Sequence, residues 1–207
     1  DTHIKGTLEY KHYPTNEDFV TVPFTREANM LQGQLPFQAP AGKLAYRVII
    51  YQNGLEIFRN DEPVIIRFKG KVPDIALLPH IFLIFLAMLF SNYCGLLVVW
   101  GKKEKLFTFS LLTVVLLTAG GMILGPVVQH FAFGQAWTGI PFGWDLTDNK
   151  TLFAYLVWIL ALFANRKQLR PGWILTAAIV LLLIYSIPHS MFGSELDYST
   201  GQVVTGE

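Results

Sequence analysis

Four apolar runs limit what this chain can fold into more than any other feature. They cover residues 75–100, 106–129, 149–165 and 172–188 of a 207-residue chain. A bilayer core of about 30 Å needs about 20 apolar residues in a helix, and the first two runs reach that length. A protein of this size has too little core to bury four such runs, so we expect four transmembrane helices that form a bundle.

The charged residues divide the chain into two parts. They make up only 15% of the chain, and most of them precede residue 75 or lie in two short clusters. An ordinary soluble domain carries about 25% charged residues, so only the first part resembles one. The third apolar run is short, and the aromatic residues Tyr155 and Trp158 in it favour an interfacial or tilted placement. We therefore predict a membrane α+β protein.

Lysine and arginine predict the orientation of the bundle. The turn after the first run carries Lys102, Lys103 and Lys105, and the turn after the third carries Arg166, Lys167 and Arg170. Basic residues gather in cytoplasmic loops, which places both turns inside the cell. Residues 1–74, the loop 130–148 and the tail 191–207 then lie outside. This arrangement suits a bacterial inner membrane with periplasmic segments and an outer C-terminus.

Residues 6–72 have the alternation and turn residues of a β domain. The strongest strand is predicted at 43–51, and others at 6–13, 19–24, 30–35 and 64–68. Asn53 and Gly54 after the strongest strand favour a tight hairpin turn. Short strands at this spacing are typical of a β-sandwich. Because the chain begins at Asp1 inside a strand-like segment, we expect further strands to precede it.

One stretch of the β domain resembles a known family. Leu35-Pro36, followed by Ala39-Pro-Ala-Gly-Lys-Leu-Ala-Tyr46-Arg-Val, is similar to the late strands of immunoglobulin-like and fibronectin-III-like extracellular domains. The resemblance covers about a third of the chain and implies a binding or spacer module without catalytic residues. The Cys-Trp-Cys core of antibody domains is absent, so the resemblance is to the looser sandwich type.

Three histidines fall at the predicted outer ends of the apolar runs. They are His80, His130 and His189. An up-and-down bundle brings such positions to one membrane depth, and imidazole binds both metals and haem iron. The three histidines are therefore candidate ligands of a metal or a haem. Their spacing fits no local ligand motif, and histidines hydrogen-bonded at the headgroup level are the preferred explanation.

The outer loop 130–148 combines bend-forming residues with large apolar side chains. Trp137, Phe142 and Trp144 exceed what a solvated loop needs, so we expect the loop to contact a partner, cap the bundle or lie on the bilayer. Asp148 is predicted as the N-cap of the third helix. Asp145 has no such explanation and joins the three aromatic residues as a candidate partner-binding residue.

Several classes of site and partner are disfavoured by the composition. A net charge of +1 provides no basic face for a nucleic acid. Cys94 is the single cysteine, which excludes an intrachain disulfide and a cysteine-based metal site. Gly121 and Gly125 form a Gly-x-x-x-Gly pattern, for which we expect close helix packing within the bundle.

Three functions are compatible with this pattern. The first is a non-catalytic membrane subunit of a cell-envelope complex, which docks other membrane or periplasmic subunits through the outer β domain and the aromatic loop. The second is a redox subunit that binds metal or haem through the outer histidines. The third, a hydrolase or transferase using Asp145 and a histidine, has the least support, because no catalytic nucleophile has a recognisable context. We therefore expect no catalytic residues.

Overall fold

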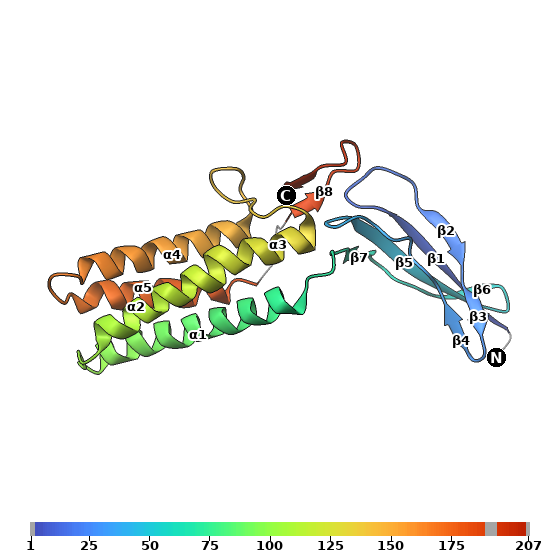
Figure 1. Cartoon of the computed structure of the whole chain (residues 1–207). Coiled ribbons are helices and arrows are strands. Elements are labelled where there is room, and N and C mark those ends of the chain that lie inside the picture. Colours follow the sequence, from blue (N-terminus) through green and yellow to red (C-terminus); the bar gives the residue numbers. More distant parts are fainter. Residues whose placement is uncertain (1–2, 189–193, 206–207) are drawn as a thin grey trace. The chain divides into compact units, whose positions relative to one another are not determined.

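A computed structural model describes residues 3–188 and 194–205. The chain divides into two compact units, one formed by Asp1–Gly70 with Glu195–Val204 and the other by Lys71–Ser194 with Thr205–Glu207. The first unit is built of antiparallel strands and the second of helices (Figure 1). The mixed α+β class predicted from the sequence is confirmed.

The β unit is organised around one long central strand, β5 (Lys43–Gln52). On one side β5 pairs with β1 (Ile4–His12), which pairs in turn with β2 (Val20–Pro23). On the other side its two halves pair with β6 (Leu55–Arg59) and β7 (Val64–Arg67). β-branched residues in the middle of β5 favour this extended central position. A separate hairpin is formed by β3 (Thr25–Glu27) and β4 (Met30–Gln32).

The turn between β5 and β6 follows the predicted chemistry. Asn53 and Gly54 have φ of 53° and 83°. A two-residue hairpin turn with positive φ at both positions matches the right-handed twist of its strands, and Asn-Gly adopts it at low cost. The predicted hairpin turn is confirmed.

Residues 195–204 of the predicted tail belong to the β unit. β8 (Ser194–Leu196) and β9 (Val203–Thr205) form a hairpin. The Leu196 amide donates to the Ala41 carbonyl at 3.1 Å, and the Tyr198 hydroxyl donates to the Lys43 carbonyl at 2.8 Å. Glu195 adds an ion pair with Lys43. These contacts fix the hairpin beside the start of β5.

The described residues of the helical unit form five α-helical segments and one π-helical segment. They are α1 (Asp74–Val99), α2 (Leu106–Leu117), η1 (Thr118–Leu124), α3 (Gly125–Phe133), α4 (Leu146–Ala164) and α5 (Pro171–Ser186). α2, η1 and α3 continue one another from Leu106 to Phe133. α1 packs against α2 and α5, and α4 packs against the same two helices. Neighbours along the chain therefore pack side by side (Figure 1).

Three of these helices are long and apolar enough to cross a membrane, as expected of an integral membrane protein. They are 74–99, 106–133 and 146–164, with mean hydropathies of 2.3, 2.2 and 1.2. The third predicted run, expected to be short, begins earlier than predicted and has 19 residues. α5 has 16 residues and is the short one. Whether α5 also crosses stays a prediction.

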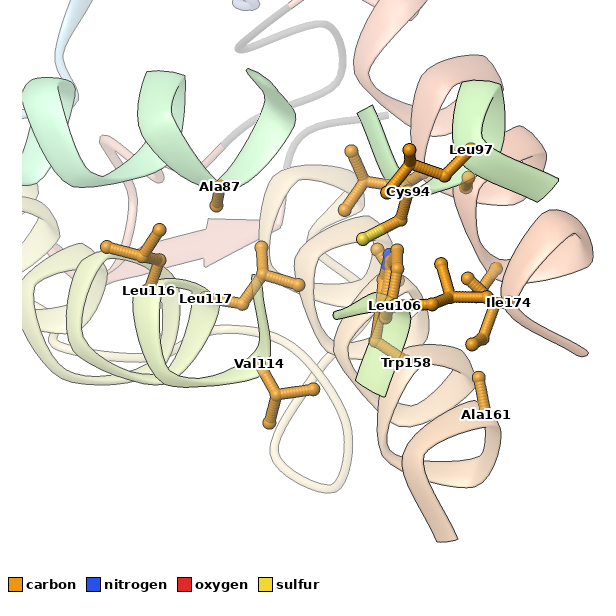
Figure 2. Packing of buried hydrophobic residues seen from close by; sticks show 14 residues of the cluster. Ala87, Cys94, Leu97, Leu106, Val114, Leu116, Leu117, Trp158, Ala161 and Ile174 are labelled. Atoms are coloured by element: carbon orange, nitrogen blue, oxygen red, sulfur yellow. The ribbon is translucent and has the colours of Figure 1, made fainter. Parts of the chain in front are cut away.

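The helical core is formed by small and aliphatic residues around one tryptophan. Figure 2 shows Trp158 between Cys94, Leu106 and Ile174, and all four side chains are fully buried. Trp158 is therefore a core residue of the helical unit, whose cluster also contains small residues such as Ala177. The interfacial or tilted placement of the third span stays a prediction.

Candidate functional site at the loop before α4

Asp148 fixes the α3–α4 loop, residues 134–145, to the first turn of α4. Its side chain is 5% exposed. The Asp148 Oδ2 atom accepts hydrogen bonds from the amides of Thr138 (2.6 Å) and Gly139 (3.1 Å). The Thr138 hydroxyl and the Gln129 side-chain amide donate to the same oxygen, each at 3.1 Å. Hydrogen bonds to a charged acceptor are the strong ones, so one carboxylate orders the loop and ties it to α3.

Asp145, and not Asp148, is the N-cap of α4. Its Oδ1 accepts from the amides of Thr147 (2.8 Å) and Asp148 (3.2 Å). The predicted N-cap was wrong because the helix begins at Leu146, three residues before the expected start. Asp145 Oδ2 accepts from the amide and the hydroxyl of Ser194 at 3.1 and 3.2 Å. Both carboxylate oxygens of the buried Asp145 thus accept hydrogen bonds. These bonds give Asp145 the structural role that the sequence did not indicate.

Two further polar residues complete this end of α4. Asn149 Oδ1 accepts from the Ile140 amide at 2.7 Å. Lys150 is 5% exposed, and its Nζ donates to the carbonyls of Ile187 (2.9 Å) and Pro188 (3.3 Å). Those carbonyls follow α5, where the helix dipole favours a cation. α4 therefore binds the loop through Asp148 and Asn149, and it binds the end of α5 through Lys150.

Glycine is required where the loop crosses α4. A Cβ atom built on Gly139 would lie 2.7 Å from the Asp148 Cβ and 2.8 Å from the Asn149 Oδ1. Real Cβ atoms do not approach other atoms so closely. Any side chain at this position would therefore push the loop away from Asp148.

The fixed loop exposes large apolar side chains. Phe142 is 82% exposed and Trp144 is 78% exposed. Trp137 is half-buried, and its Nε1 donates to the Ile140 carbonyl at 3.1 Å. Of the four predicted partner-binding residues, Phe142 and Trp144 therefore lie on the surface, Trp137 supports the loop, and Asp145 is enclosed. The loop is an ordered surface with two protruding aromatic rings.

His80 and His130 lie on different helices. His80 is half-buried on α1, and its Nδ1 lies 2.8 Å from the Gly120 carbonyl of η1. His130 is exposed on α3. His189 lies outside the described residues. Within residues 3–188 and 194–205, no group of three His, Cys, Asp or Glu side chains could hold a metal ion. The three-histidine site stays a prediction.

Three residues of this site were not identified from the sequence: Thr138 and Gln129, which donate hydrogen bonds to Asp148, and Lys150. Thr138 and Gln129 stand in no motif, and only their fold partner Asp148 makes them important. Lys150 carried a signal, since a lysine two residues after an acidic residue at the start of an apolar run needs a polar partner. Chemically, both carboxylates are occupied by donors, which favours a structural role over proton transfer.

Comparison with protein-family models, curated proteins and solved structures found no match to this chain.

Proposed function

We propose that the protein is a non-catalytic integral membrane subunit of a cell-envelope complex. The observation that carries this proposal is the exposure of Phe142 and Trp144 on a loop that buried hydrogen bonds hold in place. Aromatic residues dominate the binding energy of protein interfaces, and a surface ordered before binding loses little entropy when it binds. The partners are other membrane or periplasmic subunits.

The proposed topology places this loop outside the cytoplasm of a bacterial inner membrane. The turn between α1 and α2 carries Lys102, Lys103 and Lys105, whereas residues 134–149 contain no lysine or arginine. The basic turns are cytoplasmic by the positive-inside rule. The β unit and the C-terminus then face the periplasm together with the loop.

α5 is proposed as the fourth span. Its 16 residues measure about 24 Å at 1.5 Å per residue, somewhat less than the bilayer core. Lys150 in the second turn of α4 binds the carbonyls that follow α5. The first turns of α4 and the end of α5 therefore lie at the same level of the bundle. We also keep the looser immunoglobulin-like sandwich as the proposed class of the β unit, with five strands in its larger sheet.

Co-purification tests the docking function. In mild detergent, the wild-type chain is expected to bring stoichiometric partner subunits, identified by mass spectrometry. The double variant Phe142→Ser/Trp144→Ser should lose them and keep its unfolding midpoint, because both side chains contact mainly solvent. Trp100→Ser is the matched control, since Trp100 is 62% exposed beyond the opposite end of α1. A wild-type monomer without partners, or partners retained by the double variant, would contradict the proposal.

A redox subunit is the second candidate, and one contact favours it. A carbonyl oxygen only accepts, so His80 carries its proton on Nδ1 toward Gly120. The lone pair then lies on Nε2, as in metal-ligating histidines whose other nitrogen is held by a carbonyl. The purified chain would show a haem spectrum or bound metal that His80→Ala and His130→Ala remove. A colourless, metal-free sample would contradict this function.

A further inference from the structure

A groove of about 570 Å³ crosses one face of the β unit. Lys11 on β1, Ala45 on β5 and Ile65 on β7 form its floor, since the register places them opposite one another. Residues 13–16, Phe19 and residues 62–63 form its rim. Ligand pockets in proteins have volumes of about 300–1,000 Å³, so this groove can hold several side chains of a peptide.

Two cations converge on one aromatic ring in the groove. The Lys11 Nζ lies 5.3 Å from the centroid of the Phe19 ring, and the Arg47 Cζ lies 4.9 Å from it. Lys11 and Arg47 are diagonal neighbours on the same sheet face, because Lys11 is opposite Ala45 and Glu9 is opposite Arg47. Like charges at this spacing repel each other, and a bound anion would relieve the repulsion.

The Arg47 side chain lines the groove and is half-buried. Its Nε is buried, and the described residues offer it no hydrogen-bond partner. Glu9 lies opposite in the register, but its carboxylate is 3.4 Å from the Arg59 Nη1 and forms its ion pair there. Because the Arg47 Nε has no accessible surface, a ligand in the groove would meet the terminal amino groups of the half-buried Arg47 side chain. These groups carry donors that bind a carboxylate through charged hydrogen bonds.

The apolar residues of the groove lining indicate the kind of carboxylate ligand that fits. Phe19, Ile65 and Pro63 provide apolar surface beside the cations, so the groove suits a carboxylate attached to an apolar body. Glu62 at the exposed rim is the one acidic residue of the lining and leaves an excess of positive charge. We infer that this groove binds an acidic peptide segment, with a glutamate or aspartate carboxylate on Arg47 and Lys11 and an apolar neighbour against Phe19. The inference rests on the proposed docking function and names the partner chemistry that the β unit recognises.

The test is peptide binding to the full chain in neutral detergent. The probe is a fluorescein-labelled Gly-Phe-Glu-Glu-Phe-Gly peptide, followed by fluorescence anisotropy, with the same peptide carrying glutamine for glutamate as the neutral control. We expect the acidic peptide to bind and the glutamine peptide to bind at least about tenfold more weakly, since charged hydrogen bonds are lost. Binding should also weaken as salt is added.

Variants separate the groove from general charge. Arg47→Met, which keeps the stem over Phe19, should weaken binding about tenfold or more, and Arg47→Lys should restore part of it. Glu62→Gln should tighten binding by removing a like charge. Arg26→Met is the matched control, because Arg26 is an exposed arginine on β3 outside the groove, and it should bind as wild type.

Three results would overturn the inference. They are no binding of the acidic peptide, equal binding of the glutamine peptide, and unchanged affinity in an Arg47→Met chain. N-acetylglutamate binding as tightly as the peptide would assign the groove to free small carboxylates and would also overturn it. Because these measurements need no native partner, peptide binding without co-purified subunits would contradict only the docking function, and the reverse result would contradict only the groove.

Discussion

An Asp148→Ala chain is expected to lose about 3 kcal/mol of unfolding free energy, since buried donors left without an acceptor cost about 1–3 kcal/mol each. The substitution leaves the amides of Thr138 and Gly139 buried without their acceptor. It also removes the acceptor shared by the Thr138 hydroxyl and Gln129. Because the loop then separates from α4, Phe142 and Trp144 should lose their fixed positions. Unfolding in an SDS titration, followed by tryptophan fluorescence, measures the change.

Two further variants test whether the lost hydrogen-bond acceptor causes the lower unfolding free energy. Asp148→Asn keeps an oxygen acceptor of the same shape and should lose less stability than the alanine variant. Asp74→Asn is the matched control, because Asp74 is an exposed acidic residue in the first turn of α1 and should change stability by less than about 0.5 kcal/mol. Limited proteolysis of the loop should be faster in Asp148→Ala. Wild-type stability in the alanine variant would show that Asp148 does not hold the loop.

Local patterns were sufficient for the strands that carry strong signals. β5 and its Asn53-Gly54 turn follow from β-branched residues and from a dipeptide that tolerates positive φ. β6 was missed, since its five residues include Glu56 and Arg59 and all five are exposed. A strand stabilised mainly by pairing with its neighbour leaves a weak pattern in its own sequence. The β8–β9 hairpin was missed for the same reason.

Hydropathy located the helices but not their ends. The second run was predicted to stop at 129, whereas the helix continues to Phe133 through a π-helical segment. Pro126 lies just after that segment and has no amide hydrogen, so it cannot donate the helical hydrogen bond to the preceding turn. The wider π-helical turn accommodates the missing hydrogen bond. α4 begins within the polar sequence before its apolar run, because Asp145 supplies the cap that its amides need.

The site could be predicted in its residue types but not in its roles. The unusual aromatic content of the loop indicated a surface, and two of its rings are exposed. The N-cap role predicted for Asp148 belongs to Asp145, because a shift of three residues in the helix start decides which carboxylate faces the free amides of α4. Long-range donors such as Thr138 and Gln129 have no local signature, so only the fold identifies them.

Gly120 is the second position where a single change should have a large effect. A Cβ on Gly120 would lie 2.9 Å from the Leu83 Cβ and 3.2 Å from the Ile84 backbone nitrogen of α1. Backbone cannot yield as the end of a long side chain can, so α1 and η1 must separate. We expect Gly120→Val to lower the unfolding free energy by about 1–3 kcal/mol through overpacking, with further loss if the His80 contact to the Gly120 carbonyl breaks.

Gly172→Ala is the matched control for this prediction. A Cβ on Gly172 in the first turn of α5 meets no atom within 4 Å, so alanine should leave stability unchanged or raise it slightly through its better helix propensity. Gly120→Ala should fall between the two, because its single methyl meets the same backbone. The same SDS titration measures all three. A Gly120→Val chain as stable as the Gly172→Ala chain would show that α1 does not pack closely against η1 at this glycine.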